Sequence, residues 1–200
     1  MKKNFVDRFF VELDRELGRP AEIILTGAAL GALMGNIRPS LDIDFEIKVK
    51  GSKKRNLVHE AIRRASSKIG ITVNYSEDIG HWSMISYLDY RKSAVPYQTI
   101  GRLRIKLMAP AHWTIGKMTR FLEIDIQDLL KVIKKKKLKA NPLIRFWGRA
   151  LRSSPLSMTS GHFRNHVVFF LRQYGKFLWG SGFDLDHSIT LFKRSAGIKI

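Results

Sequence analysis

The sequence contains no cysteine, and its last third is almost without acidic residues. The lack of cysteine excludes disulfide bonds, thiol catalysis and zinc sites with sulfur ligands. Residues 129–200 hold 15 lysines and arginines against only Asp184 and Asp186, a net charge of +13, whereas residues 1–128 hold 21 against 15, a net charge of +6. This asymmetry favours a polyanionic partner, with nucleic acid first and an anionic membrane surface second.

Long apolar runs are also absent. No stretch approaches the roughly 20 residues that a membrane-spanning helix needs, and Lys2, Lys3, Asp7 and Arg8 interrupt the start of the chain before the apolar core of a signal peptide can form. We therefore expect a cytoplasmic protein without a membrane partner. Its 200 residues, 44% of them hydrophobic, suffice for one substantial core and a smaller appendage.

The most informative stretch runs from Ile23 to Val49. It predicts a strand, a tight turn at Gly27, a short helix and a second strand, in which apolar residues alternate with Asp42, Asp44 and further charged residues. Residues two apart on a strand point to the same face and lie about 6 to 7 Å apart at Cα. The two carboxylates therefore converge on one small volume, where a cation or basic groups must offset their repulsion. Carboxylate oxygens of this kind suit Mg²⁺.

The turn at Gly27 and Ala28 forms the other half of this predicted site. A glycine lets the backbone approach a ligand closely. The free N–H groups at the start of the next helix favour an anion. Beside paired carboxylates and a metal, this anion is expected to be a nucleoside triphosphate. The alternative is an ordinary strand, turn and helix with a solvent-facing pair of aspartates.

Two pairs of motifs carry a resemblance to a known family. Residues 26–30 read TGAAL and residues 38–44 read RPSLDID; further along, residues 117–120 read KMTR and residues 125–129 read DIQDL. Together they resemble the polymerase-β-like nucleotidyltransferase superfamily, and specifically its bacterial branch that includes AbiEii-type toxin nucleotidyltransferases. The resemblance covers residues 23–130. The family usually has Gly-Gly or Gly-Ser where this chain has Gly27-Ala28, so one hydroxyl ligand for phosphate is missing.

The resemblance implies a reaction and a set of site residues. The reaction is the Mg²⁺-dependent transfer of a nucleoside monophosphate from an NTP to an acceptor hydroxyl. The acceptor is expected to be RNA, such as a tRNA end. The protein is expected to be the toxin of a toxin-antitoxin pair, with a cognate antitoxin protein as its partner. Lys117 is expected to neutralise the leaving pyrophosphate. The implied catalytic residues are Asp42, Asp44, Lys117 and Asp128, the metal ligands Asp42 and Asp44, and the nucleotide-binding residues Gly27, Ala28, Arg38, Ser40, Arg120 and Asp125.

Several alternatives stay open at this point. The polar face of the strand at residues 102–107 is entirely basic, so a third metal-binding carboxylate is missing or comes from Glu77, Asp78, Asp125 or Asp128. Asp125 is equally explained as a helix cap. A catalytically silent nucleic-acid-binding protein on the same fold is the alternative function.

The whole chain predicts an α/β (α+β) fold, a minimal nucleotidyltransferase domain over residues 1–140 with a small mixed sheet flanked by helices. A basic helical C-terminal subdomain follows over residues 141–200, with three helices near 143–152, 160–178 and 184–194, the last capped by Asp184. Residues 81–101 are expected to be an irregular loop whose aromatic residues flank a base or pack over the sheet. Those residues are Tyr87, Tyr90 and Tyr97, together with Arg91.

Overall fold

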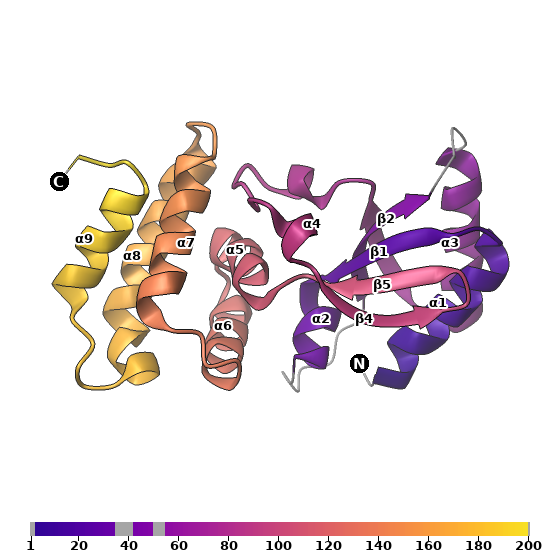
Figure 1. Ribbon diagram of the computed structural model, residues 1–200, viewed down its shortest axis with the longest axis horizontal. Helices are drawn as coiled ribbons and strands as arrows, with labels where there is room; N and C mark the ends of the chain where they lie inside the picture. The colour runs from indigo at the N-terminus through magenta and orange to yellow at the C-terminus, as the bar shows by residue number, and fades with distance from the viewer. Residues whose placement is uncertain (1–2, 35–41, 50–54, 200) are drawn as a thin grey trace. The chain divides into compact units, whose positions relative to one another are not determined.

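The computed structural model describes residues 3–34, 42–49 and 55–199 and divides the chain into two compact units (Figure 1). The sheet unit comprises Met1–Ile79 and Arg91–Ala109, and the helical unit comprises Gly80–Tyr90 and Pro110–Ile200. The predicted fold class is confirmed, because one five-stranded mixed sheet is flanked by helices and followed by further helices. Within the described ranges, no helix is long and apolar enough to cross a membrane.

The sheet unit is built on five strands in the order β3-β2-β1-β5-β4. The strands are β1 (Ala21–Thr26), β2 (Asp42–Val49), β3 (Thr72–Ser76), β4 (Val95–Ile100) and β5 (Leu103–Leu107). β1 lies antiparallel to β2 and parallel to β5, while β3 lies parallel to β2 and β4 antiparallel to β5. This order places the acid-bearing strand β2 between β1, which leads into the glycine turn, and β3.

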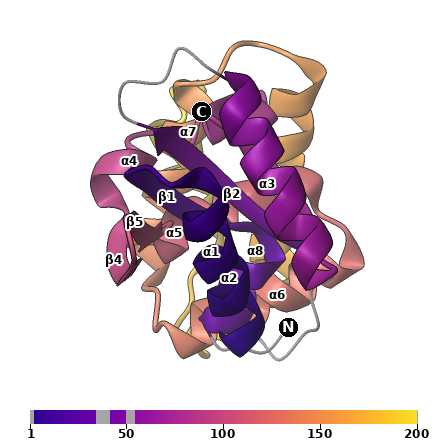
Figure 2. The same ribbon diagram turned by 90° about the vertical axis from the view of Figure 1, so that its right-hand side faces the viewer.

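The two faces of the sheet differ sharply in composition. On the apolar face, helices α1 (Lys3–Leu17) and α3 (Arg55–Ile69) lie side by side (Figure 2), and the rings of Phe9 and Phe10 contact the ring of Phe45 with centroids 5.8 and 5.7 Å apart. Alternate residues of each strand point to the other face, which is polar apart from Ile24 of β1. It carries Asp42, Asp44, Glu46 and Lys48 of β2, Thr72, Asn74 and Ser76 of β3, Glu22 and Thr26 of β1, and Arg104 and Lys106 of β5.

The expectation of an irregular loop over residues 81–101 is wrong for its last part. The segment contains a 3-10 turn, η1 (Ile79–Trp82), a short helix, α4 (Tyr90–Ser93), and the edge strand β4. Pro96 and a shift of register between Pro96 and Gln98 hide this strand from a period-2 pattern, and proline is tolerated at a sheet edge. Tyr97 points to α1, where its hydroxyl donates to the Asp7 carboxylate at 3.5 Å, and burial together with Asp7 raises its pKa to about 12.

The helical unit packs five helices around one apolar core. They are α5 (Pro110–Arg120), α6 (Glu123–Lys135), α7 (Ala140–Arg152), α8 (Met158–Trp179) and α9 (Leu185–Ser195), of which α7, α8 and α9 lie side by side (Figure 1). Asp184 caps α9 as predicted, since its carboxylate accepts the His187 N–H at 2.9 Å. Ile115 of α5 and Leu129 of α6 share the core of Trp147 and Phe170. The units therefore divide before Pro110, whereas the composition predicted a boundary near residue 140.

Candidate functional site

The turn after β1 brings the backbone into direct contact with an acid of β2. Gly27 has φ +65°, and a Cβ atom at this position would lie only 1.7 Å from Oδ2 of Asp44. The preceding residue, Thr26, is paired with Asp44 across the antiparallel ladder. Glycine is therefore required here twice, by its backbone conformation and by the room that the carboxylate needs.

Asp42 and Asp44 lie on the polar face of β2, as the alternation predicts, and both side chains are partly exposed. Asn74 of β3 joins them: its Nδ2 donates to Oδ2 of Asp42 at 3.3 Å and to Oδ1 of Asp44 at 2.9 Å. One amide nitrogen can reach both carboxylates only because they converge on the same volume, which confirms the geometry expected from their spacing. Asn74 itself was not predicted, because it becomes a neighbour through the parallel pairing of β2 with β3.

This pair of carboxylates fits a magnesium ion in its usual protein environment. Mg²⁺ keeps several waters and takes one or two carboxylates together with substrate phosphates, so two aspartates form a sufficient protein share. The amide of Asn74 also offers an oxygen after a half-turn of its terminal torsion. Across the described ranges, no group of three or more histidine or acidic side chains is arranged to hold a metal. A site with three protein carboxylates therefore finds no support in the described residues.

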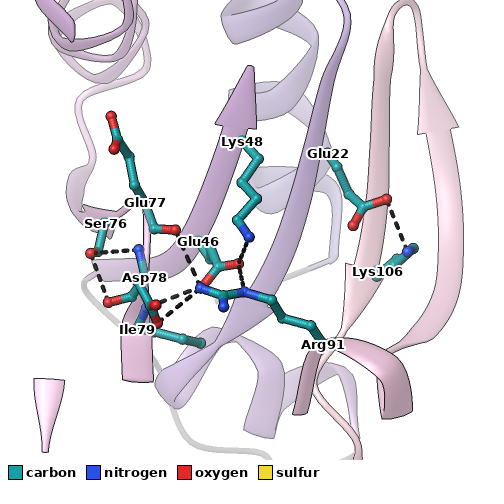
Figure 3. Close-up of polar contacts among 9 residues, drawn as sticks. All are labelled: Glu22, Glu46, Lys48, Ser76, Glu77, Asp78, Ile79, Arg91 and Lys106. Atoms are coloured by element: carbon teal, nitrogen blue, oxygen red, sulfur yellow. Dashed lines mark hydrogen bonds and ion pairs between the residues drawn. The ribbon is translucent and has the colours of Figure 1, made fainter. Parts of the chain in front are cut away.

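The third acid on this face of β2, Glu46, has a different environment. Its side chain is about 2% exposed and accepts Nε and Nη2 of Arg91 at 2.7 and 3.0 Å and the Ile79 N–H at 3.1 Å. Figure 3 shows Arg91 between Glu46 and Asp78, whose Oδ1 lies 2.9 Å from Nη2 of Arg91. Glu46 thus ties the start of η1 and helix α4 to β2. The sequence pattern alone did not single it out, although it continues the alternation of Asp42 and Asp44.

The second group of predicted residues forms an ion cluster in the helical unit, and three of its four side chains are buried. Nζ of Lys117 donates to Oδ1 of Asp125 at 2.9 Å and to Oδ2 of Asp128 at 2.7 Å, and Arg120 donates to both oxygens of Asp125 at 2.6 and 2.5 Å. Lys117 is 5% exposed and Asp125 is fully buried. Residues three apart share a helix face, so each motif presents its two charges together. A left-handed residue between α5 and α6, Phe121 at φ +54°, turns the two faces toward each other.

Asp125 also has the capping role that was left open. Its carboxylate accepts the N–H of Leu122 at 3.3 Å, at the start of α6. Burial opposes the ionised carboxylate, but the hydrogen bonds and charges of Arg120 and Lys117 outweigh this effect and hold the pKa of Asp125 below its ordinary value. Lys117, Asp125 and Asp128 are buried, whereas the Arg120 side chain is 56% exposed, so Arg120 approaches Asp125 from the solvent side. Removing one partner of such a buried ion pair is strongly destabilising.

The predicted site residues are thus distributed over two groups. Asp42, Asp44 and Gly27 come together in the sheet unit, where Ala28 follows Gly27 in the first turn of α2 (Gly27–Leu33). Lys117, Arg120, Asp125 and Asp128 come together in the helical unit, and a joint action of the two groups stays a prediction. Arg38 and Ser40 lie outside the described residues.

Comparison with models of protein families, with curated proteins and with solved structures finds no match for this chain. The function is therefore inferred from the residues themselves.

Proposed function

We propose that this protein is a Mg²⁺-dependent nucleotidyltransferase that moves a nucleoside monophosphate from an NTP to an acceptor hydroxyl, with RNA as the acceptor. The observation that carries the proposal is the arrangement around Asp44. Its carboxylate and that of Asp42 converge at the amide of Asn74, and the backbone of Gly27 lies directly against Asp44.

Each of these residues has a part in the proposed reaction. Asp42 and Asp44 would hold the metal, which when bound would supply Lewis-acid stabilisation of phosphate charge and a more acidic acceptor hydroxyl. Gly27 leaves the room that Asp44 needs to keep its carboxylate beside that of Asp42. Asn74 orients both carboxylates by its two hydrogen bonds. Together they fix the position of the triphosphate, and fixed position and charge are what phosphoryl-type transfer requires.

Lys117 keeps the role that the family resemblance implies, the stabilisation of charge on the leaving pyrophosphate. Its ammonium already has two carboxylate partners, Asp125 and Asp128. A cation that serves both the cluster and the reaction affects stability and turnover together, so these two effects must be measured separately.

A catalytically silent nucleic-acid-binding protein is the second candidate. The basic polar face of β5 favours it, since Arg104 and Lys106 stand where a further acid would be expected and Lys106 pairs with Glu22 at 2.9 Å (Figure 3). The charge of the C-terminal third fits both candidates, because phosphate contacts are needed to bind RNA either as substrate or as ligand.

A transfer assay separates the two candidates. The protein is incubated with Mg²⁺, total RNA and each NTP labelled at its α-phosphate. The proposal predicts labelled RNA with the wild-type protein and none with Asp44→Asn. Glu22→Gln is the matched control, because it also converts an acid on the polar face into an amide, and it should leave the transfer intact. RNA that binds the protein but never acquires label would support the silent binder instead.

A further inference from the structure

A groove between α8 and α9 of the helical unit is lined by cations, amides and one exposed aromatic ring. Its volume is about 520 Å³, and the residues that line it are Arg164, Asn165, Val168, Phe169, Arg172, Gln173, Lys193 and Ile198. Among these lining residues none is acidic. The family resemblance does not include this part of the chain, and none of these residues belongs to the site proposed above.

The spacing of the residues on α8 creates this surface. Positions 165, 168, 169, 172 and 173 repeat at intervals of three and four and therefore share one face of the helix. From Arg164 to Arg172 the helix rises by about 12 Å. A strand that lies along this face can therefore contact it with more than one phosphate.

The end of α9 supplies the other wall. Gly197 at φ +72° reverses the chain, and the N–H of Ile198 then donates to the carbonyl of Lys193 at 3.0 Å. This turn holds the apolar side chain of Ile198 beside the lysine at the groove. Across the part of the chain that the structure describes, Arg164, Arg172 and Lys193 form no ion pair with an acid.

Phe169 gives the groove a second property besides charge. Its side chain is 48% exposed, although a phenylalanine in the middle of a packed helix is usually buried. The ring packs edge to face against Phe121, with centroids 6.0 Å apart, so its orientation is fixed while much of its surface faces solvent. A held, exposed ring among cations is the arrangement on which proteins stack the bases of single-stranded nucleic acids.

We propose that this groove binds a single-stranded polynucleotide, with Arg164, Arg172 and Lys193 on its phosphates and Phe169 stacked on a base. Charge complementarity selects the occupant: none of the lining residues is acidic, and the 55 residues from Leu129 to Phe183, which include α8, contain no acid. The two acids of the C-terminal third, Asp184 and Asp186, lie at the start of α9, whereas Lys193 lies in its last turn. Asn165 and Gln173 add hydrogen-bonding groups that tolerate any base. The inference holds for an enzyme and for a silent binder, because it requires neither the metal nor an NTP.

The test measures fluorescence anisotropy of labelled single-stranded 12-mers of RNA and DNA with the full chain, without Mg²⁺ or NTP. Phe169→Ala should weaken binding by roughly 5-fold to 100-fold, the equivalent of losing one stacked base, and Phe169→Trp should retain it. Phe177→Ala is the matched control, since Phe177 is 62% exposed on the same helix but outside the groove. It should change affinity by less than twofold.

Salt dependence tests the phosphate contacts. Each contact contributes about −0.7 to the slope of log affinity against log salt on single strands. Lys193→Gln or Arg172→Gln should therefore make the slope shallower by about 0.7, whereas Arg194→Gln, which removes the same charge from the neighbouring position of α9, should leave it unchanged. Phe169→Ala should lower affinity without changing the slope. Circular dichroism confirms that each of these surface variants is folded.

The comparisons within each pair decide the outcome. Equal losses for Phe169→Ala and Phe177→Ala, or for Lys193→Gln and Arg194→Gln, would overturn the proposal. It would also be overturned if phosphatidylserine vesicles, and not the oligonucleotides, bound in a way that depended on these groove residues. Tighter binding of RNA than of DNA would support the proposal and add a contact to the 2′-hydroxyl group. Equal affinities would support binding through phosphates and bases alone. The measurement requires neither Mg²⁺ nor NTP, so its result is independent of the transfer assay.

Discussion

The contact between Gly27 and Asp44 gives the sharpest prediction for the sheet unit. In Gly27→Ala the new Cβ atom meets Oδ2, Cγ and Cβ of Asp44 at 1.7, 2.5 and 2.7 Å, and the residue must also keep φ +65°. Gly70→Ala is the matched control, because Gly70 has φ +69° in the same unit but nothing within 4 Å of the added atom.

The expected costs follow from these two environments. A left-handed backbone costs a residue with a side chain about 1–2 kcal/mol, and this cost is common to both variants. Overpacking typically costs a further 1–3 kcal/mol or so, and only Gly27→Ala has it. We therefore expect Gly27→Ala to be less stable than Gly70→Ala by about 1–3 kcal/mol. Because Asp44 must move, affinity for Mg²⁺ and NTP should fall in Gly27→Ala alone.

The assay must report on the sheet unit. All four tryptophans, Trp82, Trp113, Trp147 and Trp179, lie in the helical unit, so their fluorescence serves as an internal reference. Hydrogen exchange of the amides in β1 and β2, measured at increasing urea concentrations, gives the stability of the sheet. In an Asp44→Ala background, which removes the two closest atoms, the cost of Gly27→Ala should shrink. Equal stabilities of Gly27→Ala and Gly70→Ala would refute the close contact on which the site is built.

Three further predictions concern buried ionisable side chains. Arg91→Met leaves Glu46 buried without its main cation, and the free energy of unfolding measured by urea denaturation should fall by about 3 kcal/mol. Adding Glu46→Met to the same chain should restore most of this stability. An Arg91→Met variant as stable as the wild type would contradict this pairing. Lys117→Ala should lower both the stability of the protein and the turnover of the transfer reaction. If Lys117→Met kept full turnover at a temperature where it stays folded, Lys117 would have a structural role only. Burial lowers the pKa of His112 from 6.5 to about 4, so the unfolded chain takes up a proton that the folded chain refuses, and stability should decline by up to about 3 kcal/mol as the pH falls from about 6.5 to 4. His112→Phe should remove this decline, and a urea midpoint for the variant that still follows the wild-type pH profile would exclude His112 as its cause.

Local patterns in the sequence were sufficient for most of the helices and strands and for the paired aspartates. The alternation in β2 places Asp42 and Asp44 on one face whatever the neighbouring strands are, and the cap at Asp184 depends only on residues three apart. These features were predicted because their cause lies within a few residues of the chain.

Features that depend on distant pairing were not accessible to the same reasoning. Asn74 reaches the aspartates because β3 lies parallel to β2, and Arg91 reaches Glu46 from 45 residues away. The family resemblance implied catalytic roles for Lys117 and Asp128, but which carboxylates the ammonium contacts depends on how α5 packs on α6. Strand β4 was missed because an edge strand with a proline and a bulge lacks a regular alternation.

The central claim is that Asp42 and Asp44 hold a metal-bound nucleotide, and calorimetric titration with each NTP and Mg²⁺ tests it most directly. We predict that at least one NTP binds the wild-type protein in a Mg²⁺-dependent manner, that Asp42→Asn and Asp44→Asn abolish this binding while both remain folded, and that Glu22→Gln binds like the wild type. Equal nucleotide affinities in all four proteins would contradict the account.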